Sequence, residues 1–222
     1  MTTYAKRLIV EGKYDFHVVR NLLRDHDFHI GHESGEPRHN SDWIALTAED
    51  GIDPLLTIMR NYLRRGELLH LGIVVDADRN VHSRWQQIKQ RVQTIGEADF
   101  PGAPSPEGII VTVNRFTQPS LRLGVWFMPD NQNPGFLEHF ANQMIPSDDP
   151  LWPKATKAVA DLPAEQRRFI PEHAGKAELY TWLAWQEKPG KPMGLAVTFQ
   201  YLRSHAPLAQ RFVNWATRLY TP

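Results

Sequence analysis

The chain has 222 residues, of which 41% are hydrophobic and 23% charged, as in globular proteins large enough to bury a core. It contains no cysteine, which excludes disulfides, thiolate catalysis and cysteine-ligated zinc. The 25 basic and 25 acidic residues cancel, so charge alone would not hold this protein on nucleic acid. Any such contact needs a local patch, a bound metal or a partner protein.

No apolar run reaches about 18 residues, so no membrane-spanning helix and no membrane partner are expected. The N-terminal stretch MTTYAKRLIVEGKYD lacks the apolar segment of a signal peptide. These two observations predict a cytoplasmic protein. They leave open whether the chain forms a homo-oligomer.

Short apolar runs alternate with helical patterns along the first part of the chain. Strands are predicted at 6–12, 43–51, 70–76, 109–114 and 123–130, and helices at 14–26, 54–65, 82–96 and 135–145. This alternation indicates βαβ units, and therefore an α/β fold whose mostly parallel, Rossmann-like sheet is flanked by helices.

The end of the chain has a different pattern. Two segments rich in Pro, Asp and Ser, 99–107 and 146–153, are predicted to be loops. Beyond residue 150 no strand pattern is present, and helices are predicted at 178–186, 193–205 and 208–220. We therefore divide the chain into an α/β core, 1–150, and an all-helical extension, 151–222, packed on the core as one compact unit.

Acidic side chains follow several of the predicted strands. Glu11 ends the first strand, Asp76 ends the strand LGIVVD with Asp78 two residues on, and Asp130 follows VWFM. Because the carboxyl ends of parallel strands share one edge, these four acids are expected to meet there. Carboxylates held together need a compensating cation, and oxygen ligands suit Mg²⁺ or Mn²⁺. A single Asp after a strand is more often a loop or cap residue, but the Asp76/Asp78 pair with Glu11 favours a metal site.

Two motifs resemble the signatures of the Toprim domain. They are VEGKYD (10–15), with Glu-Gly after the first strand, and VVDAD (74–78), with an acidic pair after the third. Further segments are similar to the overcoming-lysogenization-defect (OLD) nucleases of the same fold. These are the ExxxD spacing of Glu11 and Asp15, the turn MPDN (128–131), Glu138 in GFLEHF and Lys176 in GKAELYTWLA. Nearly the whole chain resembles small stand-alone Toprim-like proteins.

This resemblance implies a divalent-metal-dependent nuclease that cleaves DNA or RNA and acts in phage defence. It implies that Glu11 holds a metal or acts as general acid–base, that Asp15, Asp76 and Asp78 coordinate metal, and that Glu138 helps to hold a second ion. Lys176 would offset negative charge in the transition state. OLD enzymes carry an ATPase in the same chain, whereas this sequence has no Walker A motif. The resemblance therefore points to a separately encoded ATPase as partner.

Other functions are also compatible with the sequence. A non-catalytic Toprim-like module could bind metal, nucleic acid or a partner protein without cleaving a substrate. The zero net charge and the small size of the chain favour this alternative. A phosphohydrolase that uses the acidic pair as nucleophile and acid is disfavoured, because such enzymes usually carry the pair on the first strand. Lys176 could equally be a solvated lysine at a helix start.

Overall fold

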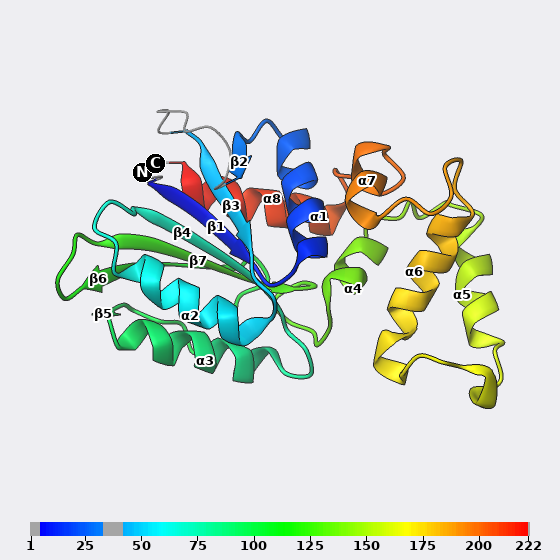
Figure 1. The fold of residues 1–222 in the computed structure, drawn as a ribbon, viewed down its shortest axis with the longest axis horizontal. Helices are drawn as coiled ribbons and strands as arrows, with labels where there is room; N and C mark the ends of the chain where they lie inside the picture. Colours follow the sequence, from blue (N-terminus) through cyan, green and yellow to red (C-terminus); the bar gives the residue numbers. More distant parts are fainter. Residues whose placement is uncertain (1–4, 33–41, 222) are drawn as a thin grey trace.

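The structure is a computed structural model, and it describes residues 5–32 and 42–221. Within these residues, seven strands form one sheet in the order β2-β3-β1-β4-β7-β6-β5 (Figure 1). The strands are β1 (Lys6–Val10), β2 (Ile30–His32), β3 (Ile44–Ala48), β4 (His70–Asp76), β5 (Gly96–Glu97), β6 (Ile109–Arg115) and β7 (Leu121–Met128). The first four strands and β7 run parallel, whereas β6 is antiparallel to β7 and β5 is antiparallel to β6.

Helices cover both faces of the sheet and extend beyond its carboxyl edge (Figure 1). The described helices are α1 (Lys13–Asp25), α2 (Ile52–Leu63), α3 (Val81–Gln93), α4 (Leu137–Asn142), α5 (Trp152–Ala160), α6 (Ala174–Ala184), α7 (Met193–Thr198) and α8 (Pro207–Tyr220), with short 3-10 turns η1 (Ala164–Gln166) and η2 (Pro171–His173). This architecture confirms the predicted α/β class with a mostly parallel sheet and a helical C-terminal region.

Two apolar cores, one on each face, hold the sheet. Side chains alternate along each strand, so Leu8 and Val10 join the core beneath α1 and α8, whereas Ile9 joins the core beneath α2 and α3. Strand β4 is central and buried on both faces, which explains its unbroken apolar run. Gly72 of β4 and Gly124 of β7 leave room for α8, because a Cβ would lie 2.4 Å from the Tyr220 hydroxyl oxygen at position 72 and 2.5 Å from a Leu219 methyl carbon at position 124.

The extension contacts the core in two ways. Helix α8 lies on the sheet, whereas α6 packs between α5 and α4 beyond the carboxyl ends of the strands (Figure 1). Residues of α5, α6, α7 and α8 all belong to the same apolar cluster as α1. Among the described residues, no helix is long and apolar enough to cross a membrane.

Some elements differ from the prediction. Helix α5 begins within the segment predicted to be a loop, 146–153, and continues to Ala160, where no element was predicted. Its pattern is weak because only Ala155 and Val159 are buried. Strands β2 and β5 have three and two residues, too few for a periodicity to be visible. The helix predicted at 193–205 ends at Thr198, where Gln200 has a φ of 59° and the Tyr201 N–H donates back to the Ala196 carbonyl.

Candidate functional site

A hydrogen bond between Asp76 and Glu11 connects the ends of β4 and β1. Glu11 follows β1 directly and Asp76 is the last residue of β4, its parallel neighbour. The Asp76 N–H donates to Glu11 Oε2 over 3.1 Å. The two carboxylates are therefore fixed at the same edge of the sheet, as the strand pattern predicts.

Asp15 reaches this edge from the first turn of α1. Only 7% of its surface is exposed, and Oδ1 has no hydrogen-bond partner within the described part of the chain. A Cβ at position 12 would lie 3.0 Å from Asp15 Oδ2, so Gly12 leaves the space that this carboxylate occupies. The glycine of the Glu-Gly motif is therefore also explained by packing, because a side chain at position 12 would crowd Asp15.

The segment after β4 positions helix α4. Asp76 Oδ1 accepts a hydrogen bond of 3.0 Å from the Leu137 N–H, at the first residue of α4. Asp78, with a φ of 51°, exchanges backbone hydrogen bonds of 3.1 and 2.8 Å with Gly135. These contacts hold the DxD motif against the G-x-L-E segment and bring Glu138 to the strand ends.

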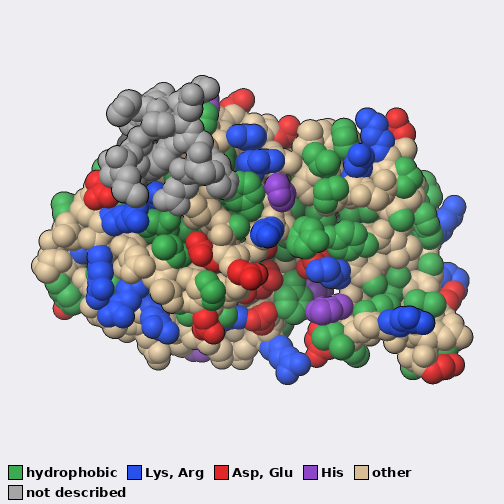
Figure 2. All heavy atoms as spheres, viewed as in Figure 1, with side chains coloured by type: hydrophobic (Ala, Val, Ile, Leu, Met, Phe, Trp, Pro, Cys, Tyr) green, Lys and Arg blue, Asp and Glu red, His purple; other side chains and the backbone are tan. Residues whose placement is uncertain are grey.

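A cleft of about 200 Å³ contains four of the predicted residues. Asp15, Asp76, Glu138 and Lys176 line it. Lys176 Nζ lies 2.9 Å from Glu138 Oε1, and the side chains are 43% and 11% exposed. Figure 2 shows acidic side chains gathered near the middle of this face, with basic and histidine side chains beside them toward the extension.

Burial and mutual repulsion favour the protonated forms of these acids. Burial, followed by the charges of Asp15, Glu11 and Glu138, raises the pKa of Asp76 to about 9. Burial and the charges of Glu11 and Glu138 raise the pKa of Asp15 to about 7. Burial also raises the pKa of Glu11, against the hydrogen bond from Asp76. The cleft therefore attracts protons or another cation.

Two of the carboxylates already have cationic partners. Asp78 forms an ion pair with Arg84, whose guanidinium also donates to Gln87. Glu138 pairs with Lys176; burial lowers the pKa of this lysine, but the Glu138 contact more than offsets that and raises it. In this arrangement, no three Asp, Glu or His side chains of the described residues form a ready metal-binding group. The donor chemistry still fits a hard divalent ion, since Asp15 Oδ1 is buried without a partner among the described residues and the carboxylates of Asp15, Asp76 and Glu138 line one cleft.

Asp130 lies apart from the other predicted acids. Its carboxylate accepts hydrogen bonds from the Gln132 and Asn133 N–H groups at 3.0 and 2.8 Å, and from Asn133 Nδ2 at 2.7 Å. It lines a different pocket, together with Arg211. Although burial acts to raise it, the hydrogen bonds from Asn133 and Gln132 lower the pKa of Asp130. The turn after β7 uses this carboxylate, so the expected fourth acid of the strand edge is not brought to the cleft.

Sequence reasoning missed Arg84. It occupies a buried position on α3 among Val81, Trp85 and Ile88. An arginine at the i and i+4 spacing of an apolar stripe is a visible signal, because buried arginines are normally paired. The partner, Asp78, could not be read from the pattern.

The fold and the cleft define a class of protein: an α/β chain with an acidic cleft, carrying one lysine, at the carboxyl edge of a mostly parallel sheet. The family model described as "Protein of unknown function (DUF3226)" matches residues 5–221, so the chain belongs to this family. No curated protein and no solved structure matches it.

Proposed function

We propose that this protein is a divalent-metal-dependent nuclease of the OLD-like Toprim type, which hydrolyses phosphodiester bonds with Mg²⁺ or Mn²⁺ as cofactor. One observation carries the proposal: carboxylates from α1, β4 and α4 meet Lys176 of α6 in a single cleft. These residues come from four separate parts of the sequence, and they are the ones that the motif resemblance singles out.

The roles follow from the surroundings of each side chain. Glu11, Asp15, Asp76 and Glu138 would hold the ions, with Asp78 available once it leaves Arg84. When bound, such ions stabilise negative charge on a phosphodiester and favour deprotonation of an attacking water. Burial raises the pKa of Glu11, which suits a role as general acid–base if this carboxylate is not taken up by an ion. Lys176, 43% exposed, can turn from Glu138 toward a phosphate oxygen.

The test uses the purified protein with supercoiled DNA, linear DNA and RNA in Mn²⁺, Mg²⁺ or chelator. The protein is tested by itself and together with the product of any adjacent ATPase gene. Cleavage should require metal, disappear in Asp76→Asn and persist in Asp130→Asn, whose carboxylate lies in the turn after β7. Cleavage that survives Asp76→Asn, or that continues in chelator, would contradict the proposal.

A second candidate is a non-catalytic Toprim-like module. It is favoured by the ion pairs that already satisfy Asp78 and Glu138, and by the lack of a ready metal-binding group among the described residues. This module would bind nucleic acid or a partner without any metal-dependent cleavage. Binding with no cleavage, under every metal and partner condition, would decide for it.

A further inference from the structure

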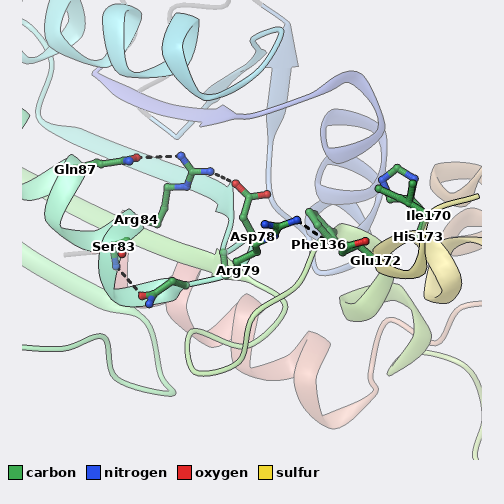
Figure 3. A pocket seen from close by; sticks show the side chains of 11 residues that line it. Asp78, Arg79, Ser83, Arg84, Gln87, Phe136, Ile170, Glu172 and His173 are labelled. Carbon is green, nitrogen blue, oxygen red and sulfur yellow. Dashed lines mark hydrogen bonds and ion pairs between the residues drawn. The ribbon is translucent and has the colours of Figure 1, made fainter.

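A second pocket adjoins the acidic cleft and has a different chemistry. It has a volume of about 410 Å³ and lies between the start of α3 and the η2 turn of the extension (Figure 3). Phe136, Glu172 and His173 line both pockets, so the two cavities share a wall. The volume falls in the range of sites that bind small molecules, about 300–1,000 Å³.

Cations and amides line the side of this pocket nearest the core. Arg84 has a side chain only 10% exposed, and Gln87 and Asp78 hold its guanidinium in place (Figure 3). Arg79 is 86% exposed and its guanidinium lies 3.0 Å from Glu172 Oε1. The pocket therefore offers the fixed guanidinium of Arg84, the movable guanidinium of Arg79, and the amide of Gln87, which can form a hydrogen bond with a polar group of a ligand.

The opposite side of the pocket presents rings and an exposed aliphatic side chain. Phe136 and His173 lie edge to face with their ring centroids 6.4 Å apart. Ile170 is 55% exposed and lines this pocket, so its side chain is accessible to a ligand. A flat apolar group inserted here would cover Ile170 and contact the Phe136 ring.

We propose that this pocket binds one unpaired nucleotide of the nucleic-acid strand, next to the phosphodiester held in the acidic cleft. The base would contact Phe136 and Ile170, since bases stack on aromatic side chains whatever their sequence. The adjoining phosphate would pair with Arg79, because guanidinium groups suit phosphate geometry. This assignment rests on the proposed function and specifies its substrate as single-stranded, overhanging or flapped, because a paired base could not enter the pocket.

The Arg79–Glu172 ion pair crosses from the loop after β4 to the η2 turn (Figure 3). A phosphate would compete with Glu172 for Arg79. The two residues therefore have opposite expected effects: Arg79→Ala removes a phosphate contact, whereas Glu172→Gln releases Arg79 for the ligand. An ion pair that served only to fix the η2 turn would give weaker binding, or no change, in both variants.

The experiment measures binding by fluorescence anisotropy in chelator, so that cleavage plays no part. The probes are a fluorescent single-stranded oligonucleotide, the same strand with abasic positions, and the matching blunt duplex. The abasic strand should bind about 5-fold or more weakly, the change expected for loss of base stacking. Arg79→Ala and Phe136→Leu should weaken single-strand binding by a similar factor, and Glu172→Gln should strengthen it. Arg91→Ala, which removes an exposed arginine from the far end of α3, is the matched charge control and should change binding less than 2-fold.

Equal affinity for abasic and intact strands, or equal losses in Arg79→Ala and Arg91→Ala, would overturn the assignment. Competition with a nucleoside monophosphate separates a free nucleotide from a strand. If the monophosphate binds and the oligonucleotide cannot displace it, the strand assignment is wrong. The two proposals can fail separately. Base-dependent binding without cleavage would support the nucleotide pocket and contradict the nuclease proposal, whereas cleavage without base-dependent binding would do the reverse.

Discussion

Lys176 of α6 and Glu138 of α4 form an ion pair of 2.9 Å at the carboxyl edge of the sheet. It joins the helical extension to the segment that follows the last parallel strand. Tyr14 at the start of α1 lies beside it, with Lys176 Nζ 5.6 Å from the ring centroid. The lysine is thus positioned by three elements, and it lines the cleft together with Asp15 and Asp76.

Replacing Lys176 should separate cleavage from metal binding. In Lys176→Ala the chain loses the group that would stabilise negative charge on the phosphate, and single-turnover cleavage should fall about 100-fold or more. Mn²⁺ affinity should stay the same or rise, because Glu138 no longer has a competing cation. Isothermal titration of Mn²⁺ and single-turnover kinetics measure the two quantities separately.

The matched control is Lys157→Ala. Lys157 also forms an ion pair on the extension, with Asp161 at 2.6 Å, but it is 74% exposed on α5. Its removal should change neither cleavage nor Mn²⁺ affinity. A loss of Mn²⁺ binding in Lys176→Ala would mean that the lysine maintains the cleft rather than serving the transition state.

Metal binding should stabilise the protein through Asp76. A ligand at 100 times its dissociation constant adds about 2.7 kcal/mol, and each kcal/mol raises the Tm of a domain this size by about 2–4 °C. Saturating Mn²⁺ should therefore raise the Tm by about 5–10 °C in differential scanning calorimetry. Asp76→Asn should remove this shift. An unchanged shift in that variant would exclude Asp76 as a ligand.

Two substitutions of Asp76 distinguish its charge from its hydrogen bond. Asp76→Asn keeps an oxygen that can accept from the Leu137 N–H, and it removes the cost of burying an ionisable carboxyl group among other acids, so the metal-free protein should be at least as stable as wild type. Asp76→Ala removes the same carboxylate but leaves that N–H without its acceptor, so it should be about 1–3 kcal/mol less stable than Asp76→Asn. Chemical denaturation in chelator measures both. Equal stability of the two variants would show that the contact to α4 contributes nothing.

The sequence predicted the α/β fold and most of its elements because their patterns are strong. The apolar run of β4 and the stripes of α2 and α3 each bury a continuous face. The convergence of Glu11 with Asp76 followed from topology alone, since parallel neighbours end at one edge. What could not be predicted depends on side-chain partners across long separations, such as Arg84 with Asp78 or Arg79 with Glu172. Asp130 was misplaced for a local reason. It follows a strand as the other acids do, but three hydrogen bonds hold its carboxylate within its own turn.

Asp130 should therefore contribute to stability and not to metal binding. Asp130→Ala removes the acceptor of two backbone N–H groups in the turn after β7 and should cost about 1–3 kcal/mol. The rise in Tm on adding Mn²⁺ should be as large as in the wild type. Paired thermal scans with and without Mn²⁺ check this. If the rise disappears, Asp130 is a ligand and the turn must rearrange when the ion binds.

The metal-free protein should lose stability as the pH rises. The pKa values of Asp15 and Asp76, about 7 and about 9, lie above that of an unfolded aspartate, about 3.9. Between these values the folded state binds more protons than the unfolded state, so the free energy of unfolding falls with increasing pH. In chelator, the Tm should decrease from pH 5.5 to pH 8.5.

The slope of this decrease can be assigned by mutation. Burial lowers the pKa of His17 and of His70, which gives the opposite slope near pH 6, so the informative quantity is the difference between wild type and Asp76→Asn. The variant should show a shallower decrease, since it lacks the group with the largest upward shift. Saturating Mn²⁺ should also flatten the wild-type curve, because the ion replaces the protons that the cleft otherwise binds. Parallel curves for the two proteins in chelator would show that Asp76 is ionised in the folded state, and that the repulsion among these acids is already relieved by Lys176 and Arg84.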